Sequence, residues 1–227
     1  MSEHIEGLVA SAEGICASLQ KSVQQGKDNV ELEARFGSMS DDGRFTAAVD
    51  KTFFNDCLQV CESFSDWKEV TDWYVRRDVF LRNSMRSSTT AKNPAVVIKK
   101  KQLGSETINL GRDPDFCLVP TAIRISLNEE MPVDCAPGLQ PGQFLRLKHI
   151  KSFETTSGWR YDFSRVWQSH VACATDGAGV DDVSTFEFEI ELADLEVARR
   201  TTAKNMAESL VLKLLDFLPP PVDVEKK

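Results

Sequence analysis

Glutamates recur at alternate positions in two stretches near opposite ends of the chain, a pattern suited to binding a hard divalent cation. In a β-strand, a period of two puts the glutamates on one face and the intervening apolar residues on the other. Carboxylates brought together raise each other's pKa values, whereas Mg²⁺ or Mn²⁺ prefers such oxygen ligands. We therefore expect the two strands to meet and hold a metal ion. The expected metal ligands are Glu31, Glu33, Glu187, Glu189 and Glu191.

Basic residues gather between the two acidic stretches, although the net charge of the chain is −8. Several of them alternate with apolar residues in strand-like segments, which again predicts one charged face for each strand. An acidic protein with basic strands inside suits a small polyanion better than a long duplex, so duplex DNA is not expected as a partner. Arginine grips phosphate oxygens in pairs and lysine acts as a point charge, which favours a bound triphosphate.

A metal ion beside a basic clamp provides what phosphoryl transfer to water requires, because the protein's main task is to position the phosphate and neutralise charge. One inward glutamate would orient or deprotonate the water. The sequence has no Walker motif, no G-x-G-x-x-G and no cysteine followed six positions later by arginine, which argues against P-loop and cysteine-dependent phosphatases. A solvated strand face is the simpler interpretation of one E-x-E segment, but not of two that flank basic strands.

The composition is typical of one globular domain, with 227 residues, 41% hydrophobic and 27% charged. No run of eighteen apolar residues is present, so we expect no transmembrane helix and no membrane partner. The acidic N-terminus lacks the features of a signal peptide, which favours an intracellular location. The six cysteines form no C-x-x-C pair and are expected to be reduced, buried thiols.

The strands and helices are predicted to form a single domain over residues 1–227. Its expected parts are an N-terminal helix (1–27), tunnel strands (28–192) with a helix (46–63), a C-terminal helix (193–218) and a tail (219–227). We also expect a loop (37–43), short strands (70–75 and 78–85), a polar turn (87–93) and an irregular segment (103–117). Small barrels usually pack apolar side chains inside. Here amphipathic helices can cover the apolar faces, so we expect these faces to point outward and the charged faces inward.

Five segments, taken in order, resemble the motifs of the triphosphate tunnel metalloenzymes, and most of all the mRNA-capping RNA 5′-triphosphatases of fungi, protozoa and large DNA viruses. The first resembles their E-x-E-x-[K/R]-F-G motif, and the last resembles their strand of three glutamates. The matching residues of the first motif are Glu31, Glu33, Arg35, Phe36 and Gly37. The segments between resemble the R-x-S-x-x-x-E, R-x-K and R-x-D-x-[T/S] strands. They begin at Arg124, Arg146 and Arg160, and the first of them ends at Glu130.

The resemblance implies an α+β fold, an antiparallel eight-stranded β-barrel tunnel with a charged interior and helices packed on the outside. It implies Mg²⁺- or Mn²⁺-dependent removal of the γ-phosphate from triphosphate-ended RNA. The implied catalytic residues are Glu31, Glu33, Glu130, Arg146, Lys148, Arg160, Asp162, Glu187, Glu189 and Glu191. The implied phosphate-binding residues are Arg35, Arg82, Lys99, Arg124, Arg146, Lys148 and Arg160. Lys101 replaces Lys99 if the register slips by two.

One position departs from the family pattern. Members often carry R-x-K-x-R, but residue 150 is Ile, and Lys151 would substitute only after a bulge. By resemblance, the partner would be a capping guanylyltransferase and the location nuclear, or a cytoplasmic virus factory for a viral protein.

Two alternative functions remain open from the sequence. One is an inorganic tripolyphosphatase or thiamine-triphosphatase of the same tunnel type, and nucleoside triphosphates or tripolyphosphate are expected as small substrates in any case. The other is a non-catalytic polyphosphate-binding module, which would keep the basic strands but would not need the inward glutamates.

Overall fold

The computed structural model describes residues 3–81, 84–110, 120–134, 144–170 and 185–218. Its helices are α1 (Glu3–Gln24), α2 (Lys51–Ser63), α4 (Leu195–Arg200) and α5 (Ala203–Leu215). Its strands are β1 (Val30–Met39), β2 (Phe45–Thr46), β3 (Glu69–Phe80), β4 (Met85–Thr90), β5 (Val96–Asn109), β6 (Ala122–Pro132), β7 (Phe144–Glu154), β8 (Trp159–His170) and β9 (Thr185–Leu192). Within these ranges, no helix combines the length and apolar character needed to cross a membrane.

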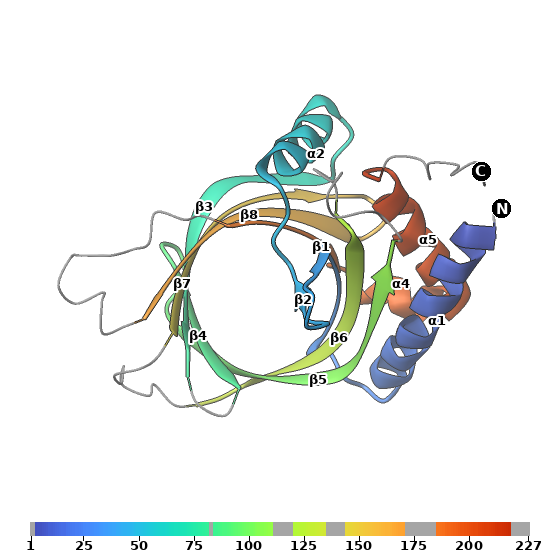
Figure 1. The fold of residues 1–227 in the computed structure, drawn as a ribbon. Coiled ribbons are helices and arrows are strands. Elements are labelled where there is room, and N and C mark those ends of the chain that lie inside the picture. The colour runs from blue at the N-terminus through green and yellow to red at the C-terminus, as the bar shows by residue number, and fades with distance from the viewer. Residues whose placement is uncertain (1–2, 82–83, 111–119, 135–143, 171–184, 219–227) are drawn as a thin grey trace.

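Eight strands close into an antiparallel barrel because β1 pairs with β6 on one side and with β9 on the other. The order around the ring is β1, β6, β5, β4, β3, β7, β8 and β9. The short strand β2 pairs with the end of β1 and lies outside the closed ring, across one side of the opening in Figure 1. The predicted eight-stranded antiparallel tunnel with helices outside is confirmed.

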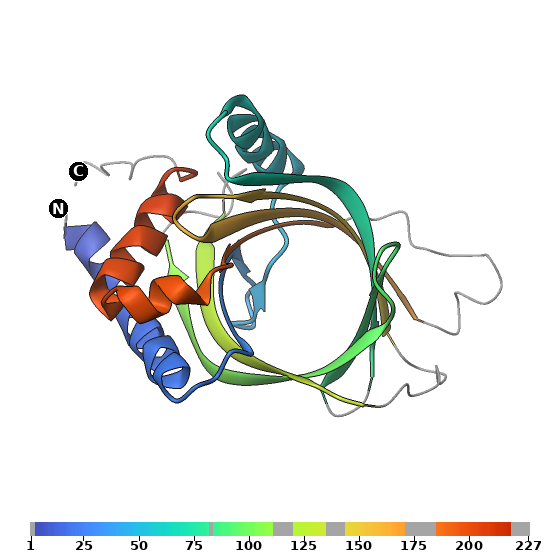
Figure 2. The ribbon, with the colours of Figure 1, turned by 180° about the vertical axis from the view of Figure 1, so that it is seen from behind.

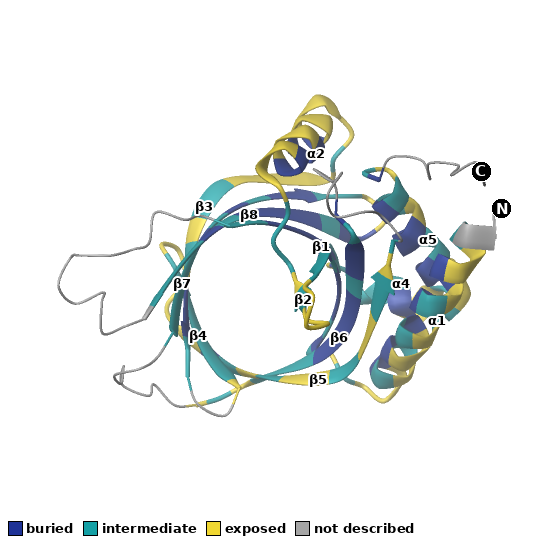
Figure 3. Ribbon diagram, in the orientation of Figure 1, coloured by how far each residue is buried: buried dark blue, intermediate teal, exposed yellow. Residues whose placement is uncertain are grey.

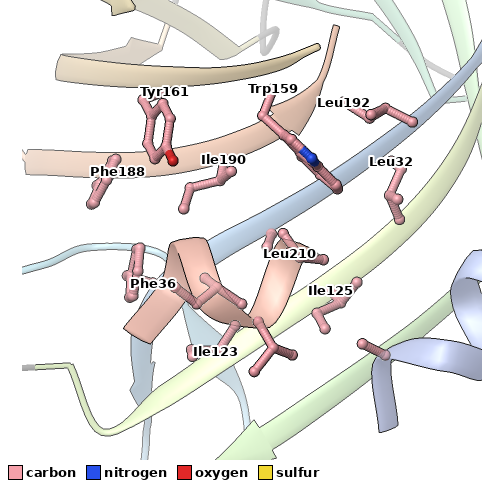
Figure 4. Close-up of a cluster of buried hydrophobic side chains, with 14 of the residues drawn as sticks. Leu32, Phe36, Ile123, Ile125, Trp159, Tyr161, Phe188, Ile190, Leu192 and Leu210 are labelled. Carbon is pink, nitrogen blue, oxygen red and sulfur yellow. The ribbon is translucent and has the colours of Figure 1, made fainter. Parts of the chain in front are cut away.

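The hydrophobic core lies on the outer face of the barrel. Leu32, Ala34 and Phe36 of β1 are fully buried, and so are Phe188 and Ile190 of β9. Figure 2 shows α1, α4 and α5 together against one wall and α2 against another. In Figure 3, the buried residues lie where the helices cover the strands. Figure 4 shows Leu210 of α5 among the apolar side chains of the strands. The helices therefore keep water from the apolar faces and leave the inner faces free to carry charge.

Stacked aromatic rings join the strands of this outer core. The Phe188 ring centroid lies 4.3 Å from that of Phe163 and 4.9 Å from that of Phe36, in both cases in a stacked arrangement. Phe217, after α5, meets Phe188 edge-on at 4.9 Å. The rings thus connect β1, β8 and β9 to the C-terminal segment, with offset and edge contacts that aromatic pairs favour.

Gly37 explains how β2 approaches the barrel. A Cβ atom at this position would lie 2.0 Å from the Thr46 carbonyl oxygen and 2.7 Å from the Phe45 ring. Only glycine permits so close an approach. The predicted loop at 37–43 therefore begins later, since β1 continues to Met39 and pairs there with β2.

Two predicted helices have different boundaries in the structure. The helix predicted from residue 46 begins at Lys51, because Asp50 caps it by accepting a hydrogen bond from the Thr52 backbone N–H at 2.6 Å. The predicted C-terminal helix is interrupted between α4 and α5. There, the Thr202 hydroxyl caps α5 by accepting from the Asn205 N–H at 3.1 Å.

Four predictions in the middle of the chain differ from the structure in their bounds or in their type. The strand predicted at 70–75 lies within β3, which continues without the expected break into the first residues of the strand predicted at 78–85. The predicted turn at 87–93 was wrong, because β4 occupies its first half. The first part of the segment predicted as irregular at 103–117 is the second half of β5, and residues 111–117 lie outside the described residues. β4 consists of Met-Arg-Ser-Ser-Thr-Thr, so its polar composition gives no alternation to detect.

The thiols at Cys16, Cys57 and Cys61 are free and buried, as expected. Burial raises the pKa of each to about 12, which makes them inert packing groups. Cys117, Cys135 and Cys173 lie outside the described residues.

Candidate active site

Charged side chains from the inner faces of the strands line a cavity of about 200 Å³ inside the barrel. Its lining residues are Glu31, Arg35, Arg76, Arg86, Lys100, Glu130, Lys148, Ile150, Arg160, Asp162, Ser164, Glu189 and Glu191. Glu33 and Glu187, on the same inward faces of β1 and β9, are 5% exposed. All five predicted acidic ligands therefore lie in the barrel interior.

The two acidic strands are direct neighbours. Glu33 lies opposite Glu191 in the β1–β9 ladder, and Arg35 lies opposite Glu189. Directly opposed residues of an antiparallel pair project to the same face, so their side chains meet inside the barrel. The structure thus brings together the two glutamate stretches from opposite ends of the chain.

Basic side chains hold the central glutamates in ion pairs. Arg35 donates to Glu33 Oε2 at 2.8 Å and lies 3.5 Å from Glu189 Oε2. Lys148 lies 3.0 Å from Glu187 and 3.2 Å from Glu189. These groups sit in an interior of low dielectric, where charge pairs interact strongly.

The outer members of the acidic set are paired in the same way. Arg160 donates to Glu191 Oε2 at 2.7 Å and to Asp162 at 3.0 Å. Lys100 of β5 pairs with Glu31 and lies 3.5 Å from Glu33. Anionic and cationic side chains therefore alternate in the site. A ligand with negatively charged oxygens can replace the carboxylates as the partners of the cationic side chains.

The protonation of two adjacent glutamates differs because their charged neighbours differ. Burial alone would raise the pKa of Glu189, but Arg35, Lys148 and Arg76 hold it well below its ordinary value. Burial raises the pKa of Glu191 to about 8, with Arg160 opposing the shift and Glu31 adding to it. One carboxylate is thus firmly ionised beside another that resists ionisation.

The donor set fits a hard divalent cation in its chemistry. Within the described ranges, no three carboxylate, imidazole or thiol groups are gathered into a ready-made metal cluster, since the carboxylates turn toward Arg and Lys. Glu187 Oε2 is nevertheless buried without a hydrogen-bond partner, although Lys148 Nζ lies 3.0 Å away. The crowding that raises the pKa of Glu191 comes partly from Glu31 and Glu33. A cation bound between these carboxylates would reduce their mutual repulsion, and carboxylate oxygens are the ligands that Mg²⁺ and Mn²⁺ prefer.

Most of the predicted basic residues also lie inside. Arg35, Lys148 and Arg160 line the cavity. Arg146 pairs with Glu187 toward the β2 end of the barrel. Arg124 lies opposite Arg35 in the β1–β6 ladder, but outside the cavity: its guanidinium stacks 4.5 Å above the Phe45 ring and its Nε donates to Thr107 at 3.1 Å.

The register of β5 corrects one predicted residue. Lys100 lines the cavity in place of the predicted Lys99 or its alternative Lys101, because Lys100 lies opposite the inward Glu130 in the β5–β6 ladder. In a run of three lysines, the sequence alone does not show which one faces inward.

Residues 150 and 151 show whether β7 provides the third basic residue of the R-x-K-x-R pattern. Ile150 lines the cavity, and no bulge brings Lys151 inward. Lys151 instead points outward, 2.8 Å from Glu62 of α2 and 3.4 Å from Asp72. The third basic contact of that pattern is therefore absent from β7.

The cavity contains two arginines that were not among the predicted site residues, and Arg82 lies outside the described residues. Arg76 donates to Asp78 at 3.1 Å, and Arg86 donates to Glu130 at 3.2 Å. The Arg-x-Asp spacing of β3 repeats that of Arg160 and Asp162 in β8, and this similarity is the signal that could have identified Arg76.

Replacing Lys100 by Ala is expected to lower activity about 10–100-fold, whereas Lys99→Ala should leave it within twofold. Lys100 is the cation beside Glu31 and Glu33, where it would donate a charge-assisted hydrogen bond to a phosphate of a bound triphosphate. The two variants change the same residue type at adjacent positions. Phosphate release from a triphosphate substrate measures the effect, and equal activity in both variants would contradict the register-based assignment.

No protein-family model matches the chain, and no curated protein is similar to it in sequence. Solved structures do share the barrel. The Pct1 RNA triphosphatase of S. pombe is 18% identical, with a TM-score of 0.62 over 91% of this chain and 88% of that one. The Mimivirus capping enzyme triphosphatase is 17% identical, with a TM-score of 0.58 over 88% of this chain and 94% of that one. At these identities, the comparisons show that the chain has the fold of RNA triphosphatases of the capping pathway.

Proposed function

We propose that the protein is a metal-dependent RNA 5′-triphosphatase, which removes the γ-phosphate from triphosphate-ended pre-mRNA in the first step of capping. The observation that carries this proposal is the enclosed cavity, in which the carboxylates of β1 and β9 face basic residues from the surrounding strands. The shared fold with Pct1 and the Mimivirus enzyme supports it.

The basic residues provide the phosphate-binding part of the site. Arg35, Lys148 and Arg76 surround Glu189, and Arg86 and Lys100 meet Glu130 and Glu31. A triphosphate in the cavity would exchange these carboxylate partners for its own oxygens. Arginine and lysine would then neutralise the charge that develops on the transferred phosphoryl group.

The five glutamates of β1 and β9 would hold Mg²⁺ or Mn²⁺, which when bound polarises phosphate oxygens and neutralises their charge. In the reaction, a water oxygen bonds to the γ-phosphorus while the bond to the bridging oxygen breaks. The electron pair stays on the β-phosphate, and a carboxylate accepts a proton from the water. Glu189, which its cationic neighbours keep ionised, is suited to hold the cation rather than to accept that proton.

Phosphate release from γ-labelled triphosphate-ended RNA, with Mg²⁺ or Mn²⁺, tests the proposal. Release of one phosphate that leaves a diphosphate end supports it. Absence of release from RNA under both metals would overturn it.

A tripolyphosphatase of the same fold is the second candidate. The small volume of the cavity favours it, since about 200 Å³ accommodates a short phosphate chain. Release from tripolyphosphate but not from RNA would establish this alternative.

The product that we propose determines the expected partner. A diphosphate RNA end is the substrate of a guanylyltransferase, so we expect a capping guanylyltransferase to act next, in the nucleus or in a virus factory. Pct1 has been observed in complex with the Spt5 CTD. Co-purification of this protein with a guanylyltransferase would test the expected partnership.

A further inference from the structure

We propose that the first nucleoside of the RNA binds against Phe80 and Phe144 at one mouth of the barrel, so that the RNA enters the tunnel from this end. This inference rests on the proposed function. It names the residues that would distinguish a nucleoside 5′-triphosphate end from a bare phosphate chain.

A second cavity, of about 380 Å³, lies at the end of the barrel where β2 pairs, since Thr46 of β2 is among its lining residues. Its lining includes Phe80 of β3, Phe144 and Arg146 of β7, and Ala47 and Ala48 of the segment before α2. The volume falls within the range typical of small-ligand pockets. This mouth therefore has room for a group larger than phosphate.

The second cavity lies next to the first and shares a lining residue with it. Arg35 lines both, and Arg146 and Glu187 of the second pair with one another beside Lys148 of the first. A triphosphate held by Arg35 and Lys148 would thus have its nucleoside end beside Arg146.

The side chains of this mouth suit a nucleobase. Phe80 and Phe144 lie opposite each other in the β3–β7 ladder, with ring centroids 6.4 Å apart and planes at 64°. The Arg146 guanidinium lies 6.0 Å from the Phe80 ring centroid. Aromatic rings and arginine planes are the groups on which proteins stack unpaired bases, and such stacking tolerates any base. A capping enzyme must act on transcripts of many sequences, which fits this mode of contact.

The opposite ends of the same two strands are less positive than the aromatic mouth. The cavity there shares Arg160 with the first cavity and is also lined by Glu69 and Glu154, of which Glu154 pairs with Lys68. The lining of the aromatic mouth carries two arginines, Arg35 and Arg146, and one glutamate, Glu187, so it holds the greater positive charge for the phosphates of an RNA chain. The aromatic mouth is therefore the favoured entrance, and the direction of the substrate follows from it.

The test compares Phe80→Ala and Phe144→Ala with wild type on triphosphate-ended RNA, ATP and tripolyphosphate. We expect kcat/KM to fall about 5–150-fold for RNA and for ATP, the loss typical of one stacked base. Hydrolysis of tripolyphosphate, which has no nucleoside, should change less than twofold. The variants Phe80→Trp and Phe144→Trp, which keep an aromatic ring, should retain activity on RNA. The variants Phe80→Leu and Phe144→Leu should lose it as the Ala variants do.

The control variant is Phe64→Ala, which removes an aromatic side chain that is 51% exposed on the outside of the barrel. It should leave all three activities unchanged.

Equal losses on RNA and tripolyphosphate would mean that the two rings serve only the barrel structure, and unchanged RNA activity would mean that they do not contact the nucleoside. A loss on RNA without a loss on ATP would assign the pocket to a later base. Each of these results overturns the inference while the wild-type enzyme still acts on RNA. Failure of the wild type on RNA would overturn the proposed function itself, and the inference with it.

Discussion

Replacing Glu189 by Gln is expected to lower phosphate release about 10²–10³-fold, the range typical of losing one electrostatic contact to the reacting groups. Glu189 lines the cavity and lies within ion-pair distance of Lys148 and Arg35. Those cations and Arg76 hold its pKa well below its ordinary value, so it is ionised at neutral pH and can hold a cation. Gln keeps the shape of the side chain but removes the charge.

Stability must be separated from activity in this variant, because removing one partner of a buried ion pair typically destabilises a protein by about 3–5 kcal/mol. Arg35 retains Glu33, and Lys148 retains Glu187, so we expect the loss of stability to be smaller. Thermal unfolding shows the temperature range in which the variant is folded, and activity is then compared within that range. Glu62→Gln is the matched control, since Glu62 pairs with Lys151 outside the barrel. Full activity of Glu189→Gln would exclude Glu189 from the reaction.

The acidic half of the site was predictable because each strand has two strongly contrasting faces. Phe188 and Ile190 alternate with Glu187, Glu189 and Glu191, so one register alone buries the apolar set against the helices. The order of the charged motifs resembles that of a known family, and this resemblance predicted the closed barrel. Packing and motif order thus pointed to the same arrangement of β1 and β9.

The basic half was harder to predict because hydrophobic contrast is weaker in β3, β4 and β5. Lys99, Lys100 and Lys101 form an uninterrupted charged run, so only pairing with β6 decides that Lys100 faces inward. Arg86 lies in a strand of polar residues, and its inward direction depends on contact with Glu130 from a distant part of the chain. These assignments rest on strand register, which a charged segment does not encode by itself.

Adding Mn²⁺ to metal-free protein is expected to raise its unfolding midpoint by about 5–10 °C, and EDTA is expected to abolish phosphate release. A ligand at about 100 times its Kd stabilises the folded state by about 2.7 kcal/mol, and 1 kcal/mol shifts the midpoint by about 2–4 °C in a chain of this size. The gain would come from Glu31, Glu33 and Glu191, whose crowding helps raise the pKa of Glu191. A bound cation would relieve that repulsion.

Variants at the same carboxylates make the metal prediction specific. Glu33→Gln and Glu191→Gln each remove one of two carboxyl groups that lie opposite each other in the β1–β9 ladder, so each should reduce the Mn²⁺-dependent shift by at least half. Glu62→Gln, outside the barrel, should show the full wild-type shift. An identical shift in all variants would place the metal elsewhere, and full activity of the wild type in EDTA would exclude a metal from the reaction. Because unfolding is measured without substrate, the site assignment is tested independently of which triphosphate the protein hydrolyses.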